Sequence, residues 1–285
     1  MRIAGLLVLS ATLLASSTLS AKPKSLISMP FVGNWEVNYD DNSCHLYARF
    51  GSKPDEIVLK LTRYQPGDPF DLNLFGKPFI SGTRDVDVTL DFGVPGGPVK
   101  RAALAGHAGK LPFLLVGFHR IDGRFPDDGS ALPPVTAEQE AAAKSLTIGY
   151  HGKLYRLETG RLDRPLAKLR ECQTDLVKFW GFDPTVQAQL SRPATPVGNP
   201  GNWAGSNDFP KAALANGQSG RVKFRLDVNE AGAVTNCVVL EQTRPTEFAK
   251  TSCQILVRRG KFTPALDKDG KPVRSFWVSS IVWLA

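Results

Sequence analysis

Histidine and cysteine are scarce in this chain, and neither occurs at the spacing of a familiar reaction centre. The sequence contains no C-x-x-C pair, no H-E-x-x-H motif and no G-x-S-x-G turn, so the usual signatures of a zinc site, a metalloprotease and an α/β-hydrolase are absent. The histidines are scattered: His45, His107, His119 and His151. We therefore expect a non-enzymatic protein without a metal or other cofactor. The alternative is a hydrolase in the N-terminal part whose residues meet only through tertiary folding.

Long apolar runs are also missing, except at the start of the chain. Arg2 precedes an apolar run from Gly5 to Ala15, and the small residues Ser20 and Ala21 follow it. This pattern is typical of an export signal, and the run is too short for a membrane-spanning helix. We therefore expect residues 1–21 to be a signal peptide cleaved near Ala21, which would leave a periplasmic protein with no membrane span. An uncleaved N-terminal anchor is the alternative.

The four cysteines fall two and two in the halves of the chain. Export would place them in an oxidising compartment, where cysteines form structural disulfides. Three connectivities are possible, and pairing within each half gives Cys44 with Cys172 and Cys237 with Cys253. The second pair would close a loop of about 15 residues, a constraint of about 3 kcal/mol in the chain-entropy model.

Positive charge is concentrated near the C-terminus. The chain carries a net charge of +8, and residues 201–285 hold 12 Lys and Arg against 7 Asp and Glu. A basic patch is formed by Arg258, Arg259 and Lys261. These residues either complement the end of a helix as a solvated face or attract an acidic partner. A nucleic-acid partner is not expected, because the chain has no recognition motif and no basic run.

Short alternating segments separated by Gly and Pro turns dominate residues 22–190, which we expect to form a β-rich domain. The predicted strands are Asn34–Tyr39, His45–Phe50, Glu56–Arg63, Asp85–Phe92, Val99–Ala105, Leu111–Phe118 and Leu146–Tyr150. Two helices are predicted at Thr136–Lys144 and Pro165–Trp180. This spacing indicates an antiparallel sandwich or a partly open barrel. The pattern from Trp35 to Leu169 is similar to that of invasion-associated locus B proteins, which are small exported bacterial β proteins.

Residues 191–207 are rich in Pro, Gly, Asn and Ser and are expected to be a linker to a second domain, residues 208–285. In that domain, strict alternation from Arg221 to Val228 predicts a half-buried strand, and Val234–Leu240 is its hairpin partner. A helix is predicted from Thr246 to a stop at Gly260, and Phe276–Leu284 is a final strand. The order strand, strand, helix, strand predicts a small ββαβ domain, so the whole chain is of the α+β class.

Four stretches of this second domain resemble the TonB C-terminal domain family. They are Phe209–Ala213, Gly220–Asp227, Phe262–Ala265 and Gly270–Val273. The family usually has Trp where this chain has Gly260. The chain also lacks the long Pro-rich spacer and the polar membrane anchor of TonB energy transducers. The resemblance implies that an edge strand binds an extended segment of another envelope protein, with outer-membrane receptors among the partners and outer-membrane transport as the process.

The final strand is the expected binding edge. Its residues are Phe276, Trp277, Val278, Ser279, Ser280, Ile281, Val282 and Trp283. Alternation places Trp277, Ile281 and Trp283 on one face, where they would pack in a core or line a docking site. The alternative is a structural periplasmic protein in which the two domains simply pack together.

Overall fold

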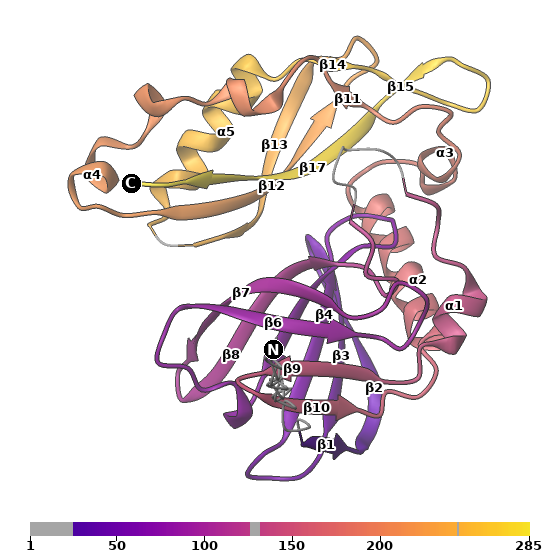
Figure 1. The fold of residues 1–285 in the computed structure, drawn as a ribbon. Coiled ribbons are helices and arrows are strands. Elements are labelled where there is room, and N and C mark those ends of the chain that lie inside the picture. The colour runs from indigo at the N-terminus through magenta and orange to yellow at the C-terminus, as the bar shows by residue number, and fades with distance from the viewer. Residues whose placement is uncertain (1–24, 126–131, 244) are drawn as a thin grey trace, which may run out of the picture.

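The computed structural model describes residues 25–125, 132–243 and 245–285, and it contains a β-rich N-terminal barrel followed by a small α+β domain (Figure 1). The predicted signal peptide, residues 1–21, lies outside the described residues. None of the helices in the described ranges has the length and apolar character needed to cross a bilayer.

Ten strands form one nearly closed sheet in the N-terminal part, with the order β1-β10-β9-β6-β7-β8-β5-β4-β3-β2. Their bounds are β1 Leu26–Met29, β2 Phe31–Asp40, β3 Ser43–Phe50, β4 Ile57–Arg63, β5 Phe70–Phe75, β6 Asp85–Asp91, β7 Val99–Ala108, β8 Leu111–His119, β9 Leu146–Tyr150 and β10 Lys153–Leu157. The two end strands of the sheet, β1 and β2, follow each other directly in the chain, but no pairing between them is present in the described residues. The barrel is therefore nearly but not fully closed.

A helix packs against the apolar core of the barrel. Helix α2 (Asp163–Phe179) lies against β2 and β3, and the Cys44–Cys172 disulfide joins it to β3. Helix α1 (Ala137–Ala142) begins with a capping box between Thr136 and Gln139 and is linked to α2 by the Glu140–Arg170 ion pair. Helix α1 lies within its predicted range, and α2 begins two residues before its predicted start at Pro165. Cys44 shares the inward face of β3 with Leu46, Ala48 and Phe50, so the side chains of α2 belong to the same core as the barrel interior.

Three strands of the barrel, β1, β5 and β10, were not predicted from the sequence. Strand β5 does alternate from Phe70 to Leu74, with Asp71 and Asn73 between the apolar residues, so its signal was present in the sequence but was not used. Strand β10 likewise forms a local hairpin with β9. Strand β1 is short, does not alternate, and pairs in parallel with the distant β10, so a period-two pattern does not identify it.

The C-terminal domain contains a three-stranded antiparallel sheet in the order β13-β12-β17, with one helix on one face. Its main elements are β12 Gly220–Val228, β13 Val234–Gln242, α5 Glu247–Arg259 and β17 Ser275–Trp283. This order is the predicted strand, strand, helix, strand. The Cys237–Cys253 disulfide joins β13 to α5. Shorter elements are α3 Pro184–Ala188, α4 Lys211–Ala215, β11 Thr195–Pro196, β14 Phe262–Thr263, β15 Ala265–Leu266 and β16 Pro272–Val273.

The segment expected to be a linker, residues 191–207, packs on the C-terminal domain. Its β11 pairs with β14, and Arg192 bridges to Leu266. Ala194 and Trp203 are buried in the same core as Phe262. The Pro and Gly residues therefore shape a chain that follows the domain surface, and they do not form a free spacer.

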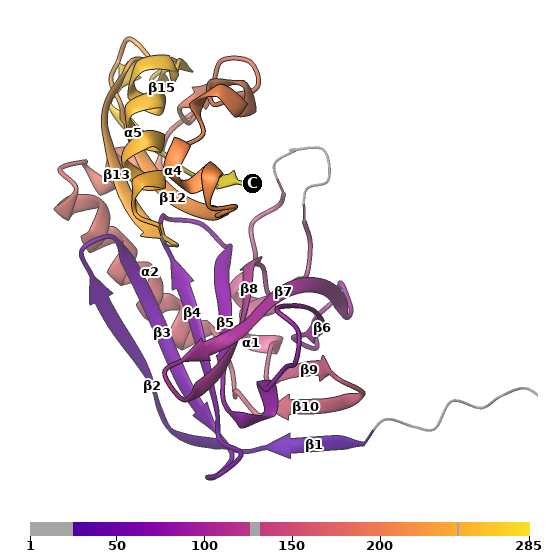
Figure 2. The ribbon, with the colours of Figure 1, turned by 90° about the vertical axis from the view of Figure 1, so that its left-hand side faces the viewer.

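The face of the C-terminal sheet opposite α5 is turned toward the barrel (Figure 2). Lys223 of β12 forms an ion pair with Asp71 of β5, and the Tyr64 hydroxyl donates to Glu241 at 2.5 Å. Phe276 packs against Trp180 and Phe182, with ring centroids 5.2 Å apart in each case. The two parts of the protein therefore share a mixed polar and aromatic interface.

This interface corrects the expectation that β12 is half-buried. Lys223, Arg225 and Asp227 retain only 8%, 4% and 7% of their exposure, so the polar face is buried as well. Arg225 donates to Asp227 at 2.8 Å and lies 4.2 Å from the ring centroid of Trp180. Alternation correctly separates the two faces of the strand, but pairing and cation–π contacts allow the charged face to be buried too.

A buried histidine links the stability of the barrel to pH. His119, at the end of β8, is 1% exposed and lies between Phe70 and Phe92, with ring centroids 6.2 and 5.7 Å away. Its Nδ1 has no hydrogen-bond partner among the described residues. Burial and, secondarily, Arg101 lower the pKa of His119 from 6.5 to about 4.

We expect the free energy of unfolding to fall as pH drops from about 6.5 to 4, because the unfolded chain then binds a proton on His119 that the folded protein does not. The histidine would contribute about 3 kcal/mol to this loss. The variant His119→Phe, which keeps an aromatic ring at this site, should flatten the pH dependence by that amount in urea denaturation. A slope equal to that of the wild type would contradict a neutral, buried His119.

Candidate functional site

Strand β17 is an edge of the C-terminal sheet, and its outer side has no strand partner in the described part of the chain. It pairs with β12 alone, in an unbroken antiparallel register from Gly220↔Trp283 to Val228↔Ser275. No turn or loop backbone among the described residues bonds to positions 276–284 either. The outer backbone edge of β17 is therefore unpaired within the described residues.

The backbone groups that point outward can be assigned from the register. Arg221 directs both its N–H and its carbonyl toward β13, where they bond to Thr243. Successive residues of a strand point these groups to opposite sides, so Val222 points toward β17 and bonds with its partner Ile281. Position 282 and every second residue before it, 280, 278 and 276, then present their N–H and carbonyl groups to the open side.

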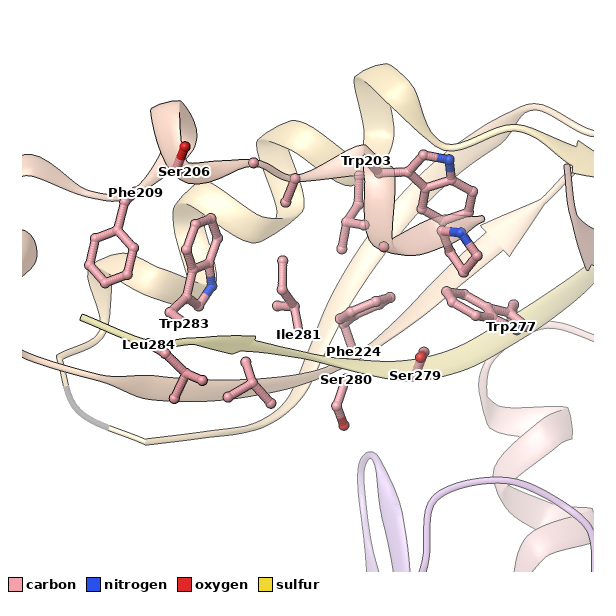
Figure 3. A pocket seen from close by; sticks show the side chains of 16 residues that line it. Trp203, Ser206, Phe209, Phe224, Trp277, Ser279, Ser280, Ile281, Trp283 and Leu284 are labelled. Carbon is pink, nitrogen blue, oxygen red and sulfur yellow. The ribbon is translucent and has the colours of Figure 1, made fainter. Parts of the chain in front are cut away.

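The side chains of β17 alternate between two different environments. Trp277, Ser279, Ile281 and Trp283 lie on the face that also carries α5, whereas Ser280 lies on the opposite face (Figure 3). Phe276 contacts Trp180 and Phe182 on that opposite face. The prediction that Trp277, Ile281 and Trp283 share a face is confirmed, because Ile281 packs with Trp277 in one apolar cluster and with Trp283 in the other, both of which include residues of α5.

An aromatic groove runs along β17. It has a volume of about 480 Å³, and its second wall is the segment 200–209. Trp203 from this wall packs on Phe262 and Trp277, with centroids 5.4 and 5.8 Å away. Phe209, farther along the same wall, lies 5.5 Å from Trp283. The free backbone of an edge strand and a groove lined by aromatic rings therefore lie side by side (Figure 3).

The wall segment 200–209 is held in place by an ion pair. Arg259, at the end of α5, donates to both carboxylate oxygens of Asp208 at 2.6 and 2.8 Å and to the Trp203 carbonyl at 2.8 Å. The hydrogen bonds from Arg259 lower the pKa of Asp208. Of the predicted basic patch, Arg259 therefore positions the groove, while Arg258 and Lys261 remain exposed on the surface.

The sequence did not identify the wall segment 200–209. Its composition indicates a linker, and only the isolated Trp203 in a run of Pro, Gly and Asn hinted at burial. The disulfide-bonded cysteines lie away from this groove, since none of them lines it. Within the described ranges, no cluster of three or more His, Cys, Asp or Glu side chains could hold a metal ion.

Gly260 is constrained by the turn that follows α5. A Cβ at this position would lie 2.5 Å from the Leu256 carbonyl oxygen and 2.9 Å from the Val234 side chain. A large side chain therefore cannot be placed here without moving the helix end. The aromatic ring that packs beside Phe262 is supplied instead by Trp203 from the wall segment.

We expect Asp208→Asn to loosen the wall of the groove, because the neutral amide cannot form the charged pair with Arg259. Amide hydrogen exchange of residues 203–209 should accelerate roughly tenfold, with β12 unchanged. Asp269→Asn, which alters an exposed carboxylate in the turn after β15, is the matched control. Unchanged exchange in Asp208→Asn would mean that the wall is held by aromatic packing alone.

Comparison with known families covers only this C-terminal part. No curated protein matches the chain, and the resemblance of the N-terminal part to invasion-associated locus B proteins finds no support. The matched range contains α4, β12, β13, α5 and most of β17. Residues 206–282 match the family model of the Gram-negative bacterial TonB protein C-terminal, so this part of the chain is similar to TonB C-terminal domains.

Proposed function

We propose that this protein is an exported, non-enzymatic envelope protein that binds an extended segment of another envelope protein by adding it as a strand to β17. The observation that carries this proposal is the unpaired outer edge of β17 beside the aromatic groove. Strand addition gives affinity through main-chain hydrogen bonds and specificity through side-chain pockets.

The family match supports the partner class. A TonB C-terminal domain indicates a TonB-like role, with outer-membrane receptors as partners and transport across the outer membrane as the process. The family is non-enzymatic, whereas the barrel has no family assignment. Two disulfides fit an oxidising compartment such as the periplasm. Arg258 and Lys261 are the exposed cations of the basic patch that could attract an acidic envelope partner.

Proline substitution can test edge pairing without breaking the sheet. The N–H of Val278 points to the open side, so Val278→Pro removes a donor for an incoming strand but no bond to β12. We expect a synthetic octapeptide of alternating Val and Thr to shift the amide NMR signals of residues 276–282 in the full mature chain. Its affinity should fall roughly tenfold or more in Val278→Pro.

Val278→Thr is the matched control, since it changes the side chain and keeps the N–H; it should bind as the wild type does. The melting temperature of each variant shows whether the fold is intact. If no peptide perturbs β17, or if Val278→Pro binds as well as Val278→Thr, edge pairing is wrong.

A second candidate function is a structural one, in which the C-terminal domain serves mainly to pack on the barrel. The interface through Lys223, Asp71, Phe276 and Trp180 favours it. We expect that cleavage within residues 191–207 leaves the two parts associated, because the interface does not depend on this segment. Size-exclusion chromatography after limited proteolysis measures this. Halves that separate freely would argue for an independent binding module.

A further inference from the structure

We infer that an extended segment bound to β17 places its side chains alternately in two sites on opposite faces of the sheet. One site is the aromatic groove, and the other is a basic cleft shared with the barrel. The ligand class is an extended peptide in which apolar residues alternate with acidic ones. This inference rests on the proposed edge pairing and adds the side-chain chemistry of the partner.

The basic cleft lies on the opposite side of β17 from the aromatic groove. It has a volume of about 270 Å³. Strand β17 contributes Val278 and Ser280, and β12 contributes Arg221 and Lys223. The remaining lining comes from the barrel rim, residues 62–71, together with Phe118 of β8. The barrel therefore forms one wall of a hollow that touches the free edge.

Arg221 is the cation of this cleft without a carboxylate partner among the described residues. Arg221 forms no ion pair there, and its Nη2 donates to Ser280 Oγ at 3.4 Å, which places the guanidinium over β17. Arg63 is 2% exposed and donates only to neutral groups, Gln173 Oε1 at 3.3 Å and the Asp68 carbonyl at 2.9 Å. Its Nε has no hydrogen-bond partner within the described part of the chain.

The acidic groups nearby are already engaged. Asp71 is paired with Lys223, and Glu241 accepts the hydrogen bond of Tyr64. Burial and Glu241 raise the pKa of Tyr64, so its hydroxyl stays protonated and remains a donor. Burial lowers the pKa of Arg63 to about 10, while the nearby carboxylates of Glu140 and Asp68 oppose this shift, so this buried guanidinium is not left without negative charge around it. The positive charge that an acidic ligand side chain can neutralise is therefore that of Arg221.

Strand geometry connects the two hollows. A segment that bonds to positions 278, 280 and 282 has side chains that alternate between the faces of the sheet at about 3.4 Å per residue. Residues directly opposite Ser280 point toward the cleft with Arg221, and their neighbours point toward Trp203 and Trp283. One face of the ligand is therefore expected to be apolar and the other acidic.

Two synthetic octapeptides test this arrangement on the full mature chain. One alternates Val with Glu, the other Val with Lys, and binding is measured by fluorescence anisotropy at physiological salt. We expect the Val/Glu peptide to bind at least about tenfold more tightly, which corresponds to about 1.4 kcal/mol. In Arg221→Glu the ratio should fall to about one or reverse, because the cation over β17 is replaced by an anion.

Lys250→Glu is the matched control, since it makes the same charge change on the exposed surface of α5, away from the cleft. It should keep the preference, which separates a local effect from attraction by the overall positive charge. Arg221→Gln, which only neutralises the site, should give an intermediate ratio and guards against misfolding of the charge reversal.

The outcomes distinguish this inference from the function on which it rests. If both peptides shift the β17 amide signals but bind equally, or if Lys250→Glu changes the ratio as much as Arg221→Glu, the two-face arrangement is overturned while edge pairing stands. If neither peptide perturbs β17, edge pairing fails and the inference fails with it.

Discussion

The arrangement of this protein depends on how the charged face of β12 is buried. Lys223 and Arg225 lie in the middle of the sheet, on the face opposite α5, where an unpaired charge would cost several kcal/mol. Asp71 of the barrel pairs with Lys223, while Asp227 and the ring of Trp180 accommodate Arg225. Removing Asp71 or Asp227 would leave a buried cation of β12 unpaired. The pair between Asp71 and Lys223 therefore holds the C-terminal sheet against the barrel at a defined place.

That placement determines what surrounds β17. With the barrel on one face and the wall segment 200–209 on the other, the edge strand lies between an aromatic groove and a basic cleft. Natural proteins usually protect an edge strand with charges, prolines or a covering element. Strand β17 has neither a charged residue nor a proline between Ser275 and Trp283. An edge left open in this way suits a protein that accepts a strand from a partner.

The wall of the groove illustrates how a segment without regular structure can shape a site. Arg259 completes the last turn of α5 and at the same time fixes Asp208 and the Trp203 carbonyl. The helix end and the groove are thus stabilised by the same guanidinium group. The two disulfides have a similar stabilising role, since each joins a helix to the strand that it covers.

The sequence by itself determined the order of the elements, because local periodicity and turn chemistry act over a few residues. The alternation in β12, the helix ending at Gly260 and most barrel strands were predictable for this reason, and the family resemblance of the C-terminal domain followed from its motifs. Strand β1 was not, since it pairs with a segment more than a hundred positions away, whereas β5 and β10 carry local signals, an alternation from Phe70 to Leu74 and a hairpin with β9, that the prediction did not use. Tertiary structure alone decided that Trp203 forms the groove wall, that Arg259 is paired, and that Arg221 and the barrel rim lie beside the open edge. These contacts join residues that are tens to more than a hundred positions apart, and no local pattern encodes which of them meet.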